Sequence, residues 1–512
     1  MDIVGDSLKK ITKGAAVYFT GTILGLLIAF VSRIIVIRYI SPAEFGLLSL
    51  SLTIFTMVSI FTSLGLPNGL TRQASYFIGK NEYEKTVAIF KAGLVLAIIS
   101  SLIADVGLFA LSNSLSKFFK MPDLSWILKI LLLALPMVIV SKIILSIFQV
   151  YEKVNIKVIF NDLMPNTLRI LLVVVVVILS LSFYWIVVAY SLAFIISGII
   201  FLIYFFREVS LETSENIYKY IKILILFSLP LLFQSTLGMI MNWTDTLMIG
   251  YFLTPSDVGL YSGVLPLAKL MINFLVAMNF IYFPLISQLY AKNQINEMGK
   301  IYAIITKWLM SASLPIFLVL FFFPNAVLRL LYGNAYVPAA YALQVLALGF
   351  FTHITFGPNG MTLIATGDVR YLTVASSIAS IVNFVLNLIL IPLFGINGAA
   401  IASALTYVTV NILISLKLYK NYGIHPFTRN YIKPAITSSV AATLIYLISR
   451  ITHLYVSCLA LVLLFVLFLA IYFLSLLLTR SFDKEDMMML LAIEQRLGID
   501  LSRVRKILKR FI

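Results

Sequence analysis

Long apolar stretches separated by short polar breaks run along nearly the whole chain. A helix needs about 20 apolar residues to cross the hydrocarbon core of a bilayer. Dividing the chain at its charged and turn-rich breaks predicts an all-α integral membrane protein with about fourteen transmembrane helices, or thirteen if two closely spaced segments form one. We expect the helices near residues 14–40, 45–71, 86–112, 124–150, 157–181, 184–206, 220–250, 257–285, 303–324, 338–365, 370–394, 397–420, 430–450 and 454–479.

Composition supports this interpretation. The chain is 61% hydrophobic and 12% charged, whereas soluble domains are about 25% charged, which excludes a soluble multi-domain enzyme and a disordered protein. The single cysteine, Cys458, excludes an intramolecular disulfide. The first apolar stretch has no small-residue cleavage site, so we expect it to remain as a membrane span.

The distribution of basic residues predicts the orientation. With the N-terminus placed inside, the inner connections and ends hold 26 Lys and Arg residues and the outer connections hold five. The positive-inside rule then places both termini in the cytoplasm of a multi-pass cell-membrane protein. The net charge of +17 is explained by this asymmetry, so no nucleic-acid partner is expected.

The connections are too short to form a catalytic domain. No phosphate-binding G-x-x-x-x-G-K-[ST] loop and no G-x-G-x-x-G occurs in the sequence. The three histidines, His353, His425 and His453, lack a potential metal-binding partner three or four residues away. We therefore expect no enzyme activity, no catalytic residues, no cofactor and no metal.

An internal repeat divides the chain. At an offset of 213 residues, Ser41-Pro42-Ala43-Glu44-Phe45-Gly46 aligns with Thr254-Pro255-Ser256-Asp257-Val258-Gly259. The offset covers six predicted spans, which gives parallel repeats of the kind found in transporters with a substrate site between two halves. We expect six-helix lobes at 1–206 and 207–420, two further spans at 421–479, and a basic amphipathic cytoplasmic tail at 480–512 lying on the membrane surface.

The sequence resembles a known family at several places. These are Ser32-Arg33, Ser41 to Leu47, Leu64-Gly65-Leu66 through Arg72, Asp245 onward into Val258-Gly259-Leu260-Tyr261-Ser262, and Ile391 to Ala402 with Gly395-Ile396-Asn397-Gly398-Ala399-Ala400. They resemble the polysaccharide-transport, or Wzx-type, oligosaccharide flippases of the MOP superfamily. The resemblance implies a two-lobed, fourteen-helix fold that moves lipid-linked oligosaccharides across the membrane, with lipid II flippases and MATE exporters as relatives.

Charged residues within the predicted spans are candidates for function, because an unpaired charge in the bilayer is costly. We expect a cleft between the lobes to bind the substrate diphosphate through four cations within the spans, Arg33, Lys142, Arg169 and Lys269, together with Arg72 directly after the second span. The alternative is that each cation pairs with an anion in helix packing.

Three acidic residues within the spans, Asp105, Asp162 and Asp245, are assigned to gating or coupling. Asp245 aligns with Ser32 in the repeat, which suggests that Asp245 and Arg33 close an outer gate; alternatively, Asp245 bonds to Asn242 or Thr246. Asp105 and Asp162 are candidates to couple transport to protons, or are permanently paired acids.

Together these features predict a non-enzymatic, monomeric transporter that flips a polyprenyl- or dolichyl-diphosphate-linked oligosaccharide by alternating access. Its partners would be the substrate, membrane lipids and, as one interpretation of the tail, a glycan-assembly enzyme. The alternatives are a MATE-like small-molecule exporter and a lipid II-type flippase.

Overall fold

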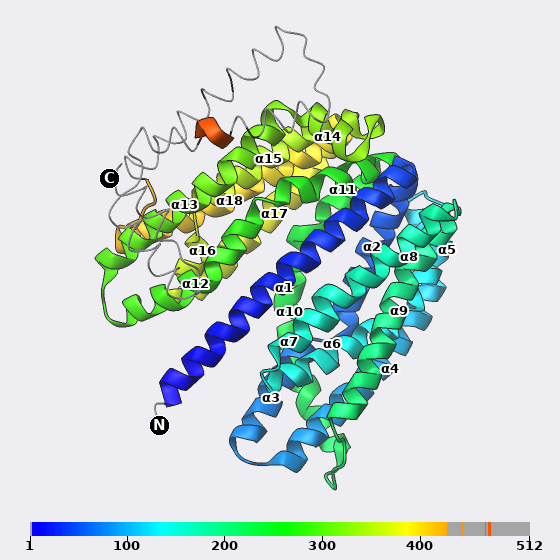
Figure 1. Cartoon of the computed structure of the whole chain (residues 1–512), viewed down its shortest axis with the longest axis vertical. Helices are drawn as coiled ribbons and strands as arrows, with labels where there is room; N and C mark the ends of the chain where they lie inside the picture. The colour runs from blue at the N-terminus through cyan, green and yellow to red at the C-terminus, as the bar shows by residue number, and fades with distance from the viewer. Residues whose placement is uncertain (1–2, 428–439, 441–442, 444–465, 467–468, 473–512) are drawn as a thin grey trace. The chain divides into compact units, whose positions relative to one another are not determined.

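The computed structural model describes residues 3–427, 440, 443, 466 and 469–472 (Figure 1). Every long regular element in these residues is a helix, and no strand occurs among them. Within the described part of the chain, nine helical segments are long and apolar enough to cross a bilayer, and two bent helix pairs raise the number to eleven. The prediction of an all-α, multi-pass membrane protein is thereby confirmed.

The predicted spans at 430–450 and 454–479 lie almost entirely outside the described residues, and the tail at 480–512 lies wholly outside them. A total of fourteen spans and the cytoplasmic placement of the termini therefore stay predictions.

The chain forms two compact units, Met1–Gly259 and Leu260–Ile512. The helices of the first unit are α1 (Ile3–Tyr39), α2 (Pro42–Thr62), α3 (Leu66–Gly79), α4 (Tyr83–Phe118), α5 (Leu124–Leu132), α6 (Leu135–Val150), α7 (Val154–Lys157), the π-helical turn η1 (Val158–Leu163), α8 (Met164–Ile178), α9 (Phe183–Glu208) and α10 (Ile217–Phe252). In this unit α1 packs on η1 and α8, while α10 packs on α2, α3 and α4. The lobe boundary at residues 206/207 stays a prediction.

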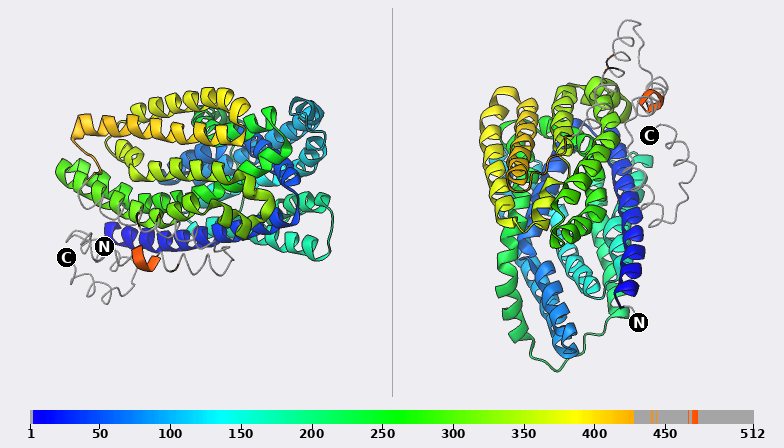
Figure 2. Two further views of the ribbon diagram at one scale, coloured as in Figure 1. Left: turned by 90° about the horizontal axis from the view of Figure 1, so that it is seen from above. Right: turned by 90° about the vertical axis from the view of Figure 1, so that its left-hand side faces the viewer.

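Helix α11 (Pro255–Lys269) begins in the first unit and continues into the second. The second unit also contains α12 (Ile272–Ala291), α13 (Ile295–Phe322), α14 (Pro324–Tyr332), the 3-10 helix η2 (Asn334–Ala339), α15 (Ala340–Thr355), α16 (Asn359–Ala365), α17 (Val369–Phe394) and α18 (Ile396–Tyr422). Helices α17 and α18, drawn in yellow, lie side by side (Figure 2).

Several predicted spans are broken rather than straight. The segment expected at 124–150 bends by 45° between α5 and α6. Pro136, in the first turn of α6, causes such a bend because it has no N–H and its ring clashes with the preceding turn. The segment expected at 157–181 passes through η1 before α8, which begins at Met164 and has Pro165 in its first turn. Breaks of this kind free backbone groups for side chains within the bundle.

The two copies of the repeat form the same local structure. At the start of α2, the Ser41 hydroxyl accepts from Glu44 N at 3.3 Å, and a Glu44 carboxylate oxygen accepts from Ser41 N at 2.8 Å. At the start of α11, Thr254 and Asp257 repeat both bonds at 3.3 and 3.1 Å. Each pair is a reciprocal helix cap, so the shared sequence pattern produces a shared structure.

The two repeated helix starts also pack against each other through glycines. A Cβ atom on Gly46 would lie 1.7 Å from the carbonyl oxygen of Pro255, and one on Gly259 would lie 1.9 Å from that of Pro42. The contact is thus reciprocal between the two copies, and neither position has room for a side chain.

We expect Gly46→Ala to lower the melting temperature of the detergent-solubilised protein, since overpacking of a tight contact costs about 1–3 kcal/mol. Gly107→Ala is the matched control, because a Cβ at Gly107 in α4 meets no atom within 4 Å. Equal melting temperatures for the two variants in thermal unfolding would contradict the tight contact.

Candidate functional site

A cluster of polar side chains surrounds Asp162 in the π-helical turn η1. The Thr22 hydroxyl of α1 donates to Asp162 Oδ2 at 2.7 Å, and Asn161 Nδ2 donates to Asp162 Oδ1 at 2.7 Å. Both carboxylate oxygens of this half-buried residue therefore have neutral donors, which lowers the cost of holding a carboxylate inside the membrane region.

Glycines in α1 bring Thr22 within reach of Asp162. A Cβ on Gly25 would lie 2.7 Å from the backbone oxygen of Asp162, and one on Gly21 would lie 2.0 Å from Val158 Cγ1. Larger residues at these two positions would separate α1 from η1. π-Helical turns occur frequently at functional sites, and Asp162 lies in such a turn.

Asn166 connects Asp162 with Arg169. Its Nδ2 donates to the backbone oxygen of Asp162 at 2.7 Å, and its Oδ1 accepts a short hydrogen bond from the Arg169 guanidinium. The guanidinium carbon also lies 5.2 Å from the centre of the Tyr190 ring. Among the described residues, Arg169 forms no ion pair, and its buried Nε has no hydrogen-bond partner. Arg169 is thus held by an amide and an aromatic ring.

Lys142 of α6 is also held by neutral groups. Its Nζ donates to the Ser59 hydroxyl of α2 at 3.0 Å and lies 3.5 Å from the Ser59 backbone oxygen. In the described part of the chain no carboxylate lies within ion-pair distance of this half-buried amine.

Arg72, on α3, is an exposed residue in contact with aromatic rings. Its guanidinium carbon lies 4.5 Å from the centre of the Phe227 ring and 6.0 Å from that of Tyr76. Lys80 Nζ lies 4.5 Å from the same Tyr76 ring. Cation–π contacts of this kind orient a cation without neutralising its charge.

The remaining predicted residues lie elsewhere in the two units. Arg33 in α1 is half-buried, and Asp245 in α10 is buried; each takes part in a further interaction. Lys269 Nζ lies 6.0 Å from the centre of the Phe350 ring in the second unit. Asp105 Oδ1 in α4 is buried and has no hydrogen-bond partner among the described residues. Of the eight predicted residues, Asp162 and Arg169 are joined in one hydrogen-bonded cluster through Asn166.

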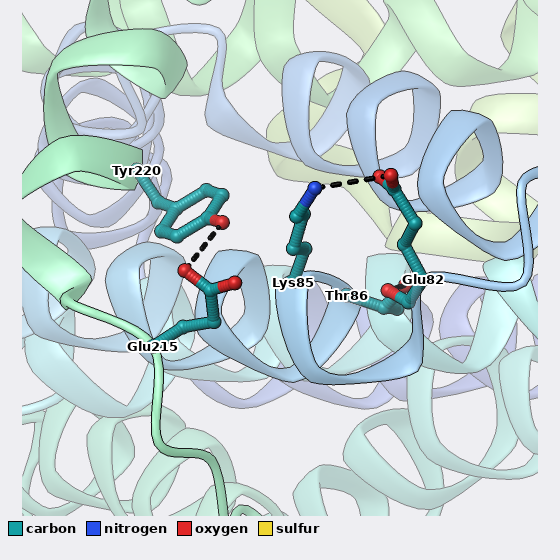
Figure 3. A network of polar contacts seen from close by, with 5 residues as sticks. All are labelled: Glu82, Lys85, Thr86, Glu215 and Tyr220. Carbon is teal, nitrogen blue, oxygen red and sulfur yellow. Dashed lines mark hydrogen bonds and ion pairs between the residues drawn. The ribbon is translucent and has the colours of Figure 1, made fainter.

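A separate polar network anchors the connection between α9 and α10. Figure 3 shows Tyr220 donating to Glu215 at 2.9 Å and Lys85 paired with Glu82 at 3.0 Å. Nearby, a hydrogen bond from Lys153 to Glu208 at 2.9 Å raises the pKa of Lys153. The Thr213 hydroxyl in this connection donates to the Glu84 backbone oxygen of α4 at 3.0 Å, which holds the connection against α4.

The sequence analysis missed the neutral partners, namely Thr22, Ser59, Asn161, Asn166 and Tyr190. The spacing of Asp162, Asn166 and Arg169 along one helix could have identified Asn166. No group of three His, Cys, Asp or Glu residues arranged to hold a metal ion occurs among the described residues.

A family described as polysaccharide biosynthesis protein matches residues 11–290, which is more than half of the 512-residue chain. The chain belongs to this polysaccharide biosynthesis family. A second family, MatE, matches residues 230–389. All eight predicted site residues lie within the polysaccharide biosynthesis match.

Relatives of this family member include two curated proteins. A probable low-salt glycan biosynthesis flippase, Agl15 of Haloferax volcanii, is 27% identical over 210 residues, which is 40% of this chain and 42% of that protein. The match thus spans less than half of Agl15. The capsular polysaccharide biosynthesis protein CapF of Staphylococcus aureus is 23% identical over 410 residues, which is 78% of this chain and 96% of CapF.

Solved structures show the same fold as this family member. A lipid II flippase MurJ in an inward closed conformation matches with a TM-score of 0.72 at 13% identity, covering 90% of this chain and 97% of that chain. An inward-facing MATE family transporter of the MOP superfamily matches with a TM-score of 0.66 at 13% identity, covering 80% and 98%. The resemblance to MOP-superfamily flippases that the sequence predicted is confirmed.

We expect Asn166→Leu to lower the melting temperature, because it removes the hydrogen-bond partners of the Asp162 carbonyl and of Arg169. A buried polar group left without a partner costs about 1–3 kcal/mol of stability. Thr167→Val is the control, since Thr167 is an exposed neighbour in the same helix. The bridging role of Asn166 is wrong if both variants unfold at the wild-type temperature.

Proposed function

We propose that this chain moves a lipid-linked oligosaccharide, carried on a polyprenyl or dolichyl diphosphate, across the cell membrane. One observation carries the proposal. Arg169 and Lys142, both within apolar helices of the first unit, are held by an amide, an aromatic ring and a hydroxyl. No described carboxylate forms an ion pair with either residue.

The energetic cost of these cations supports an anionic substrate. A charged side chain in the middle of a membrane helix costs about 2.5–3.5 kcal/mol on insertion scales. Neutral partners orient each side chain but do not compensate its positive charge. An anion that enters the bundle would therefore interact strongly with these cations. A diphosphate suits Arg169 especially, because a guanidinium can hold two phosphate oxygens at once.

The proposed mechanism is alternating access between two lobes, with no chemical step. Arg33, Arg72 and Lys269 would join Arg169 and Lys142 in a cationic path for the headgroup. Asp105 and Asp162 stay candidates for coupling transport to an ion. The names of the relatives are consistent with this proposal, since Agl15 is called a glycan biosynthesis flippase and CapF a capsular polysaccharide biosynthesis protein.

Two alternatives are supported by specific observations. The MatE match over residues 230–389 favours export of small amphipathic solutes, and the fold shared with MurJ favours a lipid II-type substrate. An exporter does not need a diphosphate-binding cation, so the dependence of transport on Arg169 and Lys142 separates it from a flippase.

We expect Arg169→Gln and Lys142→Gln each to slow the flipping of a radiolabelled polyprenyl-diphosphate oligosaccharide in proteoliposomes by about tenfold or more. A hydrogen bond to a charged group contributes about 1.5–3 kcal/mol, which corresponds to this factor. Lys117→Gln, at the exposed end of α4, is the matched control and is expected to flip at the wild-type rate.

Flipping at full rate in both variants would contradict the cationic path. Drug efflux without any flipping by the wild-type protein would favour the exporter. Flipping of lipid II but not of other diphosphate-linked glycans would restrict the substrate to the lipid II class.

A gate formed by Arg33 and Asp245 would be revealed by charge reversal. We expect Arg33→Asp and Asp245→Arg each to abolish flipping, and the double variant to recover a measurable part of it, because the attraction between the two charges is restored. If the double variant flips no better than the single variants at equal expression, the two residues do not form a gate.

A further inference from the structure

A chain of hydrogen bonds joins three helices of the second unit. Asn411 Nδ2 in α18 lies 2.8 Å from His353 Nδ1 in α15. Asn411 Oδ1 accepts from Asn359 Nδ2 in α16 at 2.9 Å, and Asn359 Nδ2 also donates to the Ser415 hydroxyl at 3.1 Å. Asn359 and Asn411 are both buried. The proposed flippase mechanism does not use this chain, which we call the amide relay.

Backbone groups at both ends fix the direction of the amide relay. The backbone N–H of Gly360 donates to Asn359 Oδ1 at 2.7 Å, so the Asn359 NH₂ group has to face Asn411. Asn411 Nδ2 donates to the Tyr407 carbonyl at 2.7 Å, so its oxygen has to face Asn359. A backbone N–H can only donate and a carbonyl can only accept. Both asparagine orientations are therefore determined.

These orientations determine the state of His353. Because Asn411 Nδ2 is a donor, His353 Nδ1 has to accept, so the imidazole is neutral and carries its proton on Nε2. A second proton on Nδ1 would place two donors against each other. Asn411 could then accept from His353 only if its amide group turned over. The Asn359 NH₂ group would then lose the oxygen that accepts its hydrogen bond, and the Tyr407 carbonyl would lose its donor.

The element at the other end of the relay is the short helix α16. It follows a break at Gly357, where φ is +66° and a Cβ would lie 2.0 Å from Thr306 Oγ1. On one side, Thr362 of α16 shares a hydrogen bond of 2.7 Å with Tyr282 of α12. On the other side, Asn359 binds α18. Turning Asn411 over would therefore break the bond between Asn359 and Asn411, while the bonds of Asn359 to Ser415 and of Thr362 to Tyr282 would remain.

No carboxylate contacts His353 among the described residues. Helix α15 packs on α12, α13, α14, α18 and η2, and the Tyr407 ring lies 5.2 Å from the imidazole, centre to centre. The titratable or charged side chains on the elements that pack on α15 are Tyr282 and Tyr290 of α12, Glu297, Lys300, Tyr302 and Lys307 of α13, Arg329 and Tyr332 of α14, Tyr336 of η2, and Tyr407, Lys417, Tyr419, Lys420 and Tyr422 of α18. Lys269 of α11 lies near Phe350 of α15. His353 is a half-buried residue.

We propose that Nδ1 of His353 is a proton-binding site, and that a proton bound there weakens the attachment of α16 to α18 by turning Asn411 over and breaking its hydrogen bond with Asn359. The ligand is H⁺ itself, taken up from water. The site goes beyond the proposed flippase activity, and only its use in transport rests on that activity.

The first test is ¹⁵N NMR of the full-length protein in lipid bilayers, with His425→Gln and His453→Gln leaving His353 as the single imidazole. We expect the Nε2–H tautomer at high pH and a doubly protonated ring at low pH, within roughly pH 5 to 8. An Nδ1–H tautomer at high pH, or no protonation in this range, would overturn the proposal.

The second test is hydrogen exchange of α16, expressed as protection factors, which correct for the intrinsic effect of pH. In the wild-type protein we expect protection of residues 359–365 to fall about tenfold as His353 is protonated, since buried bonds are lost. His353→Gln should show no such fall, because its amide oxygen accepts from Asn411 at every pH.

Asn411→Asp is the decisive variant. A carboxylate accepts from both Asn359 and a protonated His353, so protection of α16 should persist at low pH. Loss of protection at low pH in His353→Gln or Asn411→Asp, equal to that of the wild type, would overturn the proposal. Neither test uses a transported substrate, so failure of the flippase proposal would be visible separately, as an absence of flipping.

Discussion

Polar groups inside the apolar helices of this protein have to find partners within the chain, because the hydrocarbon core of a bilayer contains no water to bind them. The carboxylate of Asp162 receives donors from Thr22 and Asn161, and Lys142 donates to Ser59. In the second unit the asparagines of the amide relay satisfy each other and a histidine. This requirement explains why so many neutral polar side chains occur within the spans.

Close approach between helix backbones makes these hydrogen bonds possible. Gly25 lets α1 approach the backbone of Asp162, and Gly357 lets the break before α16 lie against Thr306. Gly46 and Gly259 do the same for the two repeated helix starts. A side chain at any of these positions would force the backbones apart, so small residues determine which helices can exchange hydrogen bonds.

The two units differ in the chemistry that they hold. In the first unit, Arg169 and Lys142 are cations oriented by neutral groups, which suits a passing anion. In the second unit, the amide relay contains no charge as long as His353 is neutral, which suits a change of protonation. The two units therefore hold different polar groups, as expected when function lies in sites and not in the fold.

The sequence alone predicted an all-α, multi-pass membrane protein, the repeated segments at Ser41 and Thr254 and the family, because apolar length, repeated spacing and motifs are local properties of the chain. It also identified Asp162 and Arg169 as polar groups in need of partners. Only the tertiary structure decided what those partners are. Thr22 lies 140 residues from Asp162, and Ser59 lies 83 residues from Lys142. Which helices meet depends on packing through glycines and on bends at prolines, which no local pattern specifies.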